Sequence, residues 1–236
     1  MVVQRCVSIT FLLVYGNDSV GKSVQLKNIC LSSEKPIYIS FEIKNRKLLE
    51  SVDFEHKEAL VIQPDYKIDS IATYHNFGKI IQDILNGKDG YDVVVIDGIS
   101  DIPRYAEKVA IAELQKSDKN RKAIGPTDMQ SWMVRNNLAH LPLERMANWA
   151  EIHGVKVFMT SLMTDEYFGE KKIGRCVDAK DRLRKLADVR VQLVKDNRGY
   201  IARFEKMPEW AAEGAAEVVV DKSGLLVEFS KRGLLR

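Results

Sequence analysis

One run of eight residues has the residue types and spacing of a phosphate-binding loop. Residues 16–23 read Gly-Asn-Asp-Ser-Val-Gly-Lys-Ser and fit G-x-x-x-x-G-K-[ST] at every fixed position. In such a loop the backbone N–H groups surround a phosphate, Lys22 reaches the β- and γ-phosphates, and the Ser23 hydroxyl ligates Mg²⁺. The predicted nucleotide site comprises Gly16, Asn17, Asp18, Ser19, Val20, Gly21, Lys22 and Ser23.

A carboxylate at the end of another buried strand would complete this site. Residues 93–97 read Val-Val-Val-Ile-Asp, which places Asp97 where four strand-forming residues end. A carboxylate at that point holds the Mg²⁺ of a bound nucleotide through water. The next residue is Gly98 rather than a second acid, so the catalytic base has to come from elsewhere.

Glu42 is the leading candidate for that base. It ends the predicted strand 36–42, which follows the helix after the loop, and we expect this strand to lie beside the first one with Glu42 near the γ-phosphate. A carboxylate there could orient or deprotonate the attacking water. The alternative is that Glu42 is only the N-cap-like acid of the following helix; Asp101 is then the fallback base.

Hydroxyl side chains end a further predicted strand, 155–161. Thr160 and Ser161 could hydrogen-bond the γ-phosphate or the water, although polar residues are also ordinary at strand ends. We place Ser161 in the predicted nucleotide site. The guanine-reading motif Asn-Lys-x-Asp does not occur, so we expect the nucleotide to be ATP.

Strands alternating with helices must position these groups. The hydrophobic pattern predicts parallel strands over 8–15, 36–42, 59–63, 92–97 and 155–161. Helices are predicted over 19–32, 70–86, from 97 to about 115, and over 128–153, which Pro142 could interrupt. A hairpin is predicted from 189–195 and 200–206 and a second from 217–220 and 225–229, whereas 165–188 is predicted to be polar with one short helix. The pattern predicts an α/β fold with a mainly parallel sheet, helices on both faces and an antiparallel C-terminal edge.

Composition and charge exclude several classes of protein. The 236 residues carry 36 basic and 33 acidic side chains, a net charge of +3, and are 45% hydrophobic, which excludes disordered and collagen-like chains. Three widely spaced cysteines support neither a zinc knuckle nor a disulfide framework. The apolar run at 6–15 is about half of a membrane span. We expect one domain over residues 1–236, a cytoplasmic location and no membrane partner.

Two further sets of residues carry no predicted function. The four histidines are too scattered to suggest a metal site. Methionines and tryptophans of the predicted helix 128–153 recur at core spacing and are predicted to pack inside the protein. They are Met129, Trp132, Met133, Met146 and Trp149.

Taken together, these residues resemble the RecA-like ATPases, especially the short, core-only RecA/RadA relatives of phages and archaeal viruses that act in single-strand annealing or recombination. The resemblance covers roughly residues 8–229: GNDSVGKS as the phosphate-binding loop, Glu42 as the catalytic glutamate, VVVIDGIS as the metal-coordinating strand and MTS as the polar strand end. It implies a three-layer RecA-like core that binds ATP and Mg²⁺ and hydrolyses the ATP.

The resemblance also implies a homo-oligomer with the nucleotide at or near a subunit interface. Residues 203–208 (RFEKMP) look like the family's late strand, whose basic residue reaches the nucleotide on a neighbouring subunit. By that carry-over Lys206, or else Arg203, is the catalytic cation supplied in trans; a solvated strand face is the alternative. No helical domain precedes Ser8 and no Phe-x-x-Ala segment occurs, which favours annealing, pairing or partner-assisted loading over strand exchange.

The family binds single-stranded DNA through two loops, and the corresponding stretches here are basic. Residues 104–122 and 166–185 each carry a net charge of +3, and Trp132, Tyr167 and Phe168 could stack on bases. Solvated basic loops are the alternative. The predicted DNA-binding residues are Lys116, Lys119, Arg121, Lys122, Lys171, Lys172 and Arg175.

Two other functions remain open from the sequence. In a small-molecule kinase of the same loop class, the basic stretch 171–184 could serve as an arginine-bearing lid over the phosphates. In a nucleotide-gated adaptor ATPase, slow hydrolysis would control a protein partner. The leading prediction is an ATPase stimulated by single-stranded DNA.

Overall fold

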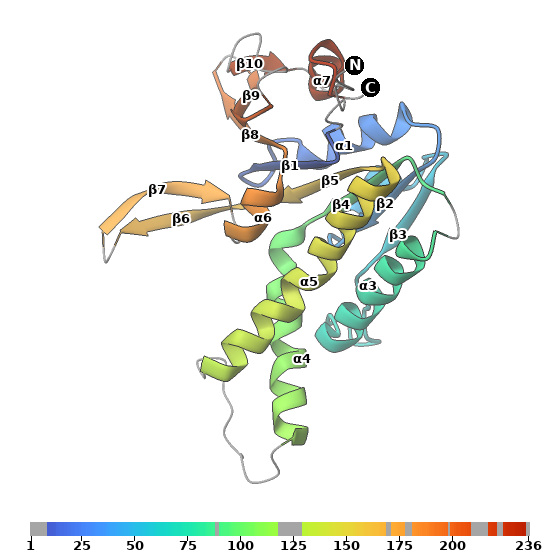
Figure 1. Ribbon diagram of the computed structural model, residues 1–236, viewed down its shortest axis with the longest axis vertical. Coiled ribbons are helices and arrows are strands. Elements are labelled where there is room, and N and C mark those ends of the chain that lie inside the picture. The colour runs from blue at the N-terminus through green and yellow to red at the C-terminus, as the bar shows by residue number, and fades with distance from the viewer. Residues whose placement is uncertain are drawn as a thin grey trace, which may run out of the picture.

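A computed structural model describes residues 9–87, 90–117, 129–168, 171–177, 181–197, 199–208, 217–220 and 224–234 (Figure 1). Its strands are β1 (Phe11–Gly16), β2 (Pro36–Ser40), β3 (Glu55–Glu58), β4 (Val93–Asp97), β5 (Lys156–Ser161), β6 (Met163–Phe168), β7 (Lys171–Val177), β8 (Val189–Asp196), β9 (Gly199–Lys206) and β10 (Glu217–Val220). Its helices are α1 (Lys22–Leu31), α2 (Asn45–Leu49), α3 (Ser70–Leu85), the 3₁₀ turn η1 (Ile99–Asp101), α4 (Ile102–Ser117), α5 (Met129–His153), α6 (Asp181–Leu186) and α7 (Gly224–Lys231).

Eight strands form one mixed sheet in the order β10-β9-β8-β1-β5-β4-β2-β3. The pairings from β8 through β1, β5, β4 and β2 to β3 are parallel. The β8–β9 and β9–β10 pairings are antiparallel. The predicted parallel sheet with an antiparallel C-terminal edge is therefore confirmed.

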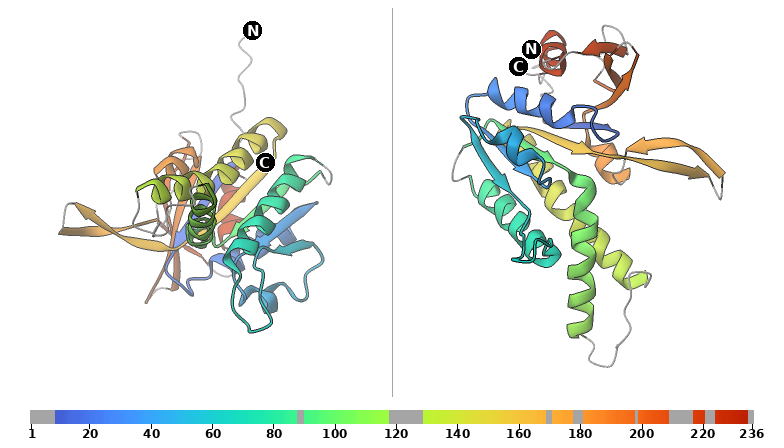
Figure 2. Two further views of the ribbon diagram at one scale, coloured as in Figure 1. Left: turned by 90° about the horizontal axis from the view of Figure 1, so that it is seen from below. Right: turned by 180° about the vertical axis from the view of Figure 1, so that it is seen from behind.

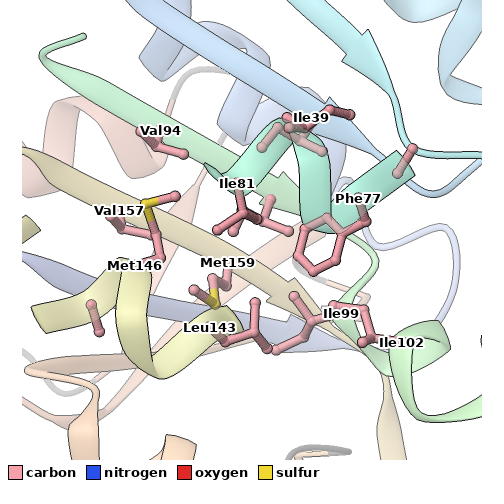
Figure 3. Close-up of a cluster of buried hydrophobic side chains, with 14 of the residues drawn as sticks. Ile39, Phe77, Ile81, Val94, Ile99, Ile102, Leu143, Met146, Val157 and Met159 are labelled. Atoms are coloured by element: carbon pink, nitrogen blue, oxygen red, sulfur yellow. The ribbon is translucent and has the colours of Figure 1, made fainter. Parts of the chain in front are cut away.

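Helices cover both faces of the sheet because its inner strands are apolar on both sides. Leu13 and Tyr15 of β1 belong to the cluster that α3, α4 and α5 cover, a layer that Figure 3 shows in close-up. Leu12 and Val14, which alternate with them, belong to the opposite cluster, beneath α1 and α7. This alternation gives the three layers that the sequence predicts.

The parallel arrangement brings the carboxyl ends of β1, β5, β4 and β2 to one edge of the sheet. In register, Tyr15 pairs with Ser161, and Ser40 pairs with Asp97. The expectation that the strand before Glu42 lies beside β1 is wrong, because β5 and β4 separate β2 from β1. Glu42 nevertheless reaches the same edge, since all four strands run in the same direction.

Two predicted strands are wrong. Residues 59–63 form no strand; β3 precedes them, and only an isolated bridge joins Ile62 to Ile68. The polar sequence of β3, Glu-His-Lys-Glu, hid it from a hydrophobic pattern because β3 lies at the edge of the sheet. Residues 225–229 belong to α7 rather than to a second hairpin: Leu225 and Phe229, one helical turn apart, are both buried.

The polar stretch 165–188 also holds more structure than predicted. It contributes most of an antiparallel hairpin, β6–β7, before the short helix α6 that the sequence does predict. Figures 1 and 2 show this hairpin and the far ends of α4 and α5 extending well beyond the sheet, in different directions.

Helix α5 continues through Pro142 without a break. Proline has no N–H to donate to the carbonyl four residues earlier, that of Leu138. The hydroxyl of Tyr74 on α3 donates to that carbonyl instead, at 2.8 Å. This bond satisfies the carbonyl that the proline leaves without its helical partner.

The core prediction for α5 holds only in its second half. Met146 is fully buried and Trp149 packs against the core, as predicted. Met129, Trp132 and Met133 are each more than half exposed, which corrects the prediction, because the first half of α5 extends beyond the sheet (Figure 1). Among the described residues, no helix has the length and hydropathy needed to cross a bilayer.

Candidate functional site

The loop at residues 16–23 joins the carboxyl end of β1 to the first turn of α1. Its two glycines are needed for different reasons. A Cβ at Gly16 would lie 2.3 Å from the carbonyl oxygen of Leu193 on β8, so no side chain fits there. Gly21 has a φ of +84°, the left-handed region that glycine enters without strain, and it begins α1 without a side-chain cap. The first N–H groups of α1 therefore point into the loop, where a phosphate could accept them.

Lys22 turns its ammonium group back into this loop. Its Nζ donates to the carbonyl oxygens of Gly16 at 3.0 Å and Asn17 at 2.7 Å. Burial lowers the pKa of Lys22, whereas the nearby carboxylates of Asp97, Asp18 and Glu42 act in the opposite direction. The ammonium thus already lies among the groups that would surround a phosphate.

The other loop residues differ in exposure. Asn17, Asp18 and Ser19 are exposed, while Val20 is buried beside β1 and β8. Ser19 has a φ of +62°, an uncommon value for a residue other than glycine. The exposed residues form the outer wall of the loop.

Asp97 is the last residue of β4 and is 1% exposed. Its Oδ2 accepts hydrogen bonds from the Tyr38 hydroxyl at 2.5 Å and from Asn45 Nδ2 at 2.7 Å. Its Oδ1 accepts one from the hydroxyl of Thr160, which in turn accepts from the backbone N–H of Gly98 at 2.8 Å. Three neutral donors therefore fix the orientation of this buried carboxylate.

Glu42 stands two residues beyond β2 and is partly buried. Its Oε2 forms an ion pair with Lys44 Nζ at 3.1 Å, and the same ammonium lies 3.5 Å from Asp18 of the loop. Burial raises the pKa of Glu42, and the charge of Asp97 raises it further, while Lys44 and Lys22 oppose the shift. A raised pKa improves a carboxylate as an acceptor of a proton near neutral pH.

Gly98 packs closely against Phe41 and Glu42. Its φ is +97°, and a Cβ there would lie 3.2 Å from Cβ of Phe41 and 3.6 Å from Cγ of Glu42. The backbone N–H of Phe41 donates to the carbonyl of Asp97 at 3.0 Å. The glycine after Asp97 is thus a packing requirement of the site.

The two hydroxyls at the end of β5 point to different partners. Thr160 bonds Asp97, whereas Ser161, 1% exposed, lies with its Oγ 3.0 Å from Oγ of Ser100 in η1. Ser100 Oγ also accepts from the backbone N–H of Leu162 at 2.7 Å. The fallback base, Asp101, pairs with Arg104 at 3.3 Å.

The predicted trans-acting cations lie away from this edge. Lys206, at the end of β9, donates through Nζ to the carbonyl oxygens of Lys185 at 3.0 Å and Ala187. Arg203 pairs with Glu217 on β10 at 2.8 Å. Among the described residues neither side chain contacts the loop of its own chain, and the role of either residue toward a second subunit stays a prediction.

The predicted DNA-binding residues are only partly described. Lys116 is exposed in the last turn of α4. Lys171, Lys172 and Arg175 lie on β7, whose backbone alone is described, and the predicted residues at 119, 121 and 122 fall outside the described residues. Lys119, Arg121 and Lys122 therefore remain predictions from the sequence.

Sequence reasoning missed Tyr38, Asn45 and Lys44. Tyr38 and Asn45 bond Asp97 from β2 and α2, and Lys44 joins Glu42 to the loop. Tyr38 sits in an apolar strand and reads as a core residue. Only the pairing of β2 with β4, which places Ser40 opposite Asp97, could have revealed its partner.

The donor set suits Mg²⁺, which prefers oxygen ligands and keeps several waters. The Ser23 side chain hydrogen-bonds the hydroxyl of Tyr38, and Tyr38 bonds Asp97, so the two predicted ligands lie on either side of one hydroxyl. Both oxygens of Asp97 already accept hydrogen bonds, which fits contact with the metal through water. Mg²⁺ held by Ser23 and Asp97 would neutralise charge on the β- and γ-phosphates.

The sheet order and the loop define a RecA-like P-loop ATPase core. The family described as "AAA domain" matches residues 10–213, and the chain belongs to this family. A comparison with curated proteins found no match.

Two solved structures are similar in fold. The crystal structure of the RadB recombinase matches with a TM-score of 0.51 and 14% identity, covering 92% of this chain and 90% of that one. A KaiC-like protein from the hyperthermophilic archaeon Pyrococcus horikoshii OT3 matches with a TM-score of 0.47 and 12% identity, over 91% and 87% of the two chains. At these identities the RadB likeness shows the fold alone, and the second match is too distant to support an argument.

Proposed function

We propose that this chain hydrolyses Mg·ATP at the loop 16–23 and couples hydrolysis to single-stranded DNA, as a single-domain, core-only member of the RecA-like group. One observation carries the hydrolytic part. A partly buried carboxylate with a raised pKa, Glu42, lies with Asp97 and Lys22 at the edge where the loop opens. That is the set of charges needed to hold a triphosphate and to activate water.

In the proposed reaction a water molecule gives a proton to Glu42 while the oxygen of that water bonds to the γ-phosphorus. The bond from that phosphorus to the bridging oxygen breaks, and ADP leaves with the electron pair. The ammonium of Lys22 donates to phosphate oxygens in place of the carbonyl oxygens of Gly16 and Asn17, and it stabilises the negative charge of the phosphates. Ser161 is proposed to contact the γ-phosphate from the end of β5.

Two projections support a DNA contact. The α4–α5 pair and the β6–β7 hairpin extend beyond the sheet (Figures 1 and 2). Most of α4 lies in the basic stretch 104–122, which α5 follows, and most of the β6–β7 hairpin lies in the basic stretch 166–185. Lys116 is exposed at the end of α4, and Trp132 is 51% exposed near the start of α5. An exposed cation for phosphates and an exposed aromatic ring for bases, both on this helix pair, suit single-stranded nucleic acid.

Coupling between the two sites is supported by a short path. The hairpin strand β6 begins two residues after Ser161, and Ser100 bonds both Ser161 and the backbone of Leu162. A structural change at the γ-phosphate would therefore be transmitted to the start of the hairpin.

A basic cavity supports assembly with the nucleotide at a subunit interface. Arg184, Lys185, Arg190 and Lys206 line a cavity of about 350 Å³. Arg190 pairs with Leu13 of β1, so the cavity lies toward the edge of the sheet opposite the loop. We propose that Lys206 in this cavity meets the phosphates bound by a neighbouring subunit.

The test is the rate of ATP hydrolysis with and without single-stranded DNA. We expect stimulation by DNA in the wild-type protein and its loss in Lys171→Glu/Lys172→Glu, with basal hydrolysis retained. Lys79→Glu, at an exposed lysine of α3, is the control for adding negative charge. Binding should weaken steeply with salt if several phosphates are contacted. A rate of hydrolysis that changes with neither DNA nor salt would refute the proposed coupling to DNA. Transfer of the γ-phosphate to a small molecule would support a kinase instead.

A further inference from the structure

Tyr38 bridges the two residues proposed to hold the metal. It lies in the middle of β2, is fully buried, and donates its hydroxyl proton to Oδ2 of Asp97 at 2.5 Å. The same hydroxyl is hydrogen-bonded by the side chain of Ser23. A tyrosine hydroxyl has one proton to give, and Asp97 takes it, so Ser23 is the donor to Tyr38.

This direction of the hydrogen bonds has a consequence for Ser23. Its own proton is then engaged by Tyr38, and the lone pairs of its oxygen remain available to another partner. A hydroxyl that ligates a cation must present lone pairs rather than its proton. The bond to Tyr38 therefore leaves Ser23 able to present lone pairs to a metal.

Asn45 supports the same arrangement from α2. Its Nδ2 donates to Oδ2 of Asp97 at 2.7 Å and lies 3.1 Å from the hydroxyl oxygen of Ser40. Asn45 is 3% exposed, so this amide is part of the interior. Tyr38 and Asn45 thus approach the same oxygen of Asp97, and Thr160 approaches the other.

We propose that Tyr38 is a positioning residue for the metal, acting through Ser23 and Asp97, with Asn45 as its partner on Asp97. The inference rests on the proposed nucleotide site and deepens it. Outer hydrogen-bond partners of this kind orient the ligands of a metal, and their removal typically costs about 10- to 100-fold in metal affinity.

The alternative is that Tyr38 only packs the core. Its ring stacks near Phe54 with centroids 6.4 Å apart, a contact that phenylalanine would keep. Tyr38→Phe therefore removes the bridging hydroxyl and leaves the packing. A purely structural role predicts a loss of stability with no specific change toward Mg²⁺.

The experiment measures the affinity for a fluorescent ATP analogue across a series of Mg²⁺ concentrations and in EDTA. For Tyr38→Phe we expect the Mg²⁺ concentration at half-effect to rise about tenfold or more, while the affinity in EDTA stays at the wild-type value. Asn45→Ala should shift the Mg²⁺ dependence in the same direction, and it serves as the second test if Tyr38→Phe does not fold. Thermal unfolding in EDTA reports whether each variant is folded.

Tyr91→Phe is the matched control. Tyr91 is also buried, and its hydroxyl donates to a carboxylate, Glu55, at 2.6 Å, but it precedes β4 at the other edge of the sheet. It should leave the Mg²⁺ dependence unchanged. A wild-type Mg²⁺ dependence in Tyr38→Phe, or an equal loss of affinity with and without Mg²⁺, would overturn the inference alone. A wild-type protein that binds no nucleotide would refute the proposed function and the inference with it.

Discussion

Gly16→Ala should damage both the fold and the site. The new Cβ would lie 2.3 Å from the carbonyl oxygen of Leu193 and 2.9 Å from Cγ2 of Val20, where ordinary contacts begin at 3.4 Å. The strands have to separate by about 1 Å, because the carbonyl belongs to the backbone of β8, the hydrogen-bonded neighbour of β1, and cannot rotate away. Overpacking of this kind costs roughly 1–3 kcal/mol or more.

Thermal unfolding and nucleotide titration measure this effect. We expect a fall in Tm of roughly 2–4 °C for each kcal/mol, as for other chains of this size, together with weaker nucleotide binding. Gly78→Ala is the matched control: Gly78 lies inside α3 with nothing within 4 Å of a new Cβ, so alanine should stabilise the helix by roughly 0.5–1 kcal/mol. A Gly16→Ala variant that unfolds like the wild type would refute the close approach of β1 to β8.

Two further substitutions test the surroundings of Glu42. Lys44→Met removes a cation that opposes the raised pKa of Glu42, so the pKa of Glu42 should rise further. Because the base must be ionised to accept a proton, the acid limb of the profile of hydrolysis rate against pH should move to higher pH. An acid limb that does not move would contradict the role of Glu42. Gly98→Ala should slow hydrolysis and lower stability more than the control Gly154→Ala. Both glycines have a positive φ, +97° and +69°, but only at Gly98 would a new Cβ lie 3.2 Å from Phe41. Equal effects in the two variants would show that backbone strain alone is responsible.

The parts of the site that follow from local sequence were predictable. A loop motif between a buried strand and a helix fixes Lys22 and Ser23, and apolar strands that end in acids give Asp97 and Glu42. These residues converge because parallel strands present their carboxyl ends at one edge, which the strand pattern predicts.

The parts that depend on strand order were not predictable. The bond between Tyr38 and Asp97 exists because β2 lies next to β4, whereas the sequence suggested that β2 lies next to β1. The edge strand β3 and the hairpin β6–β7 were missed because neither carries a continuous apolar run. Leu225 and Phe229 were assigned to a strand because a short apolar segment fits either a strand or a helix until its partner is known.

Comparing binding with hydrolysis in Glu42→Gln tests most directly whether the loop 16–23 holds ATP while Glu42 activates water. The glutamine keeps the size of the side chain but cannot accept the proton. Equilibrium binding of Mg·ATP should remain close to the wild-type affinity, while single-turnover hydrolysis should fall by about 10²- to 10⁴-fold. Hydrolysis at the wild-type rate, or loss of ATP binding together with hydrolysis, would contradict this assignment.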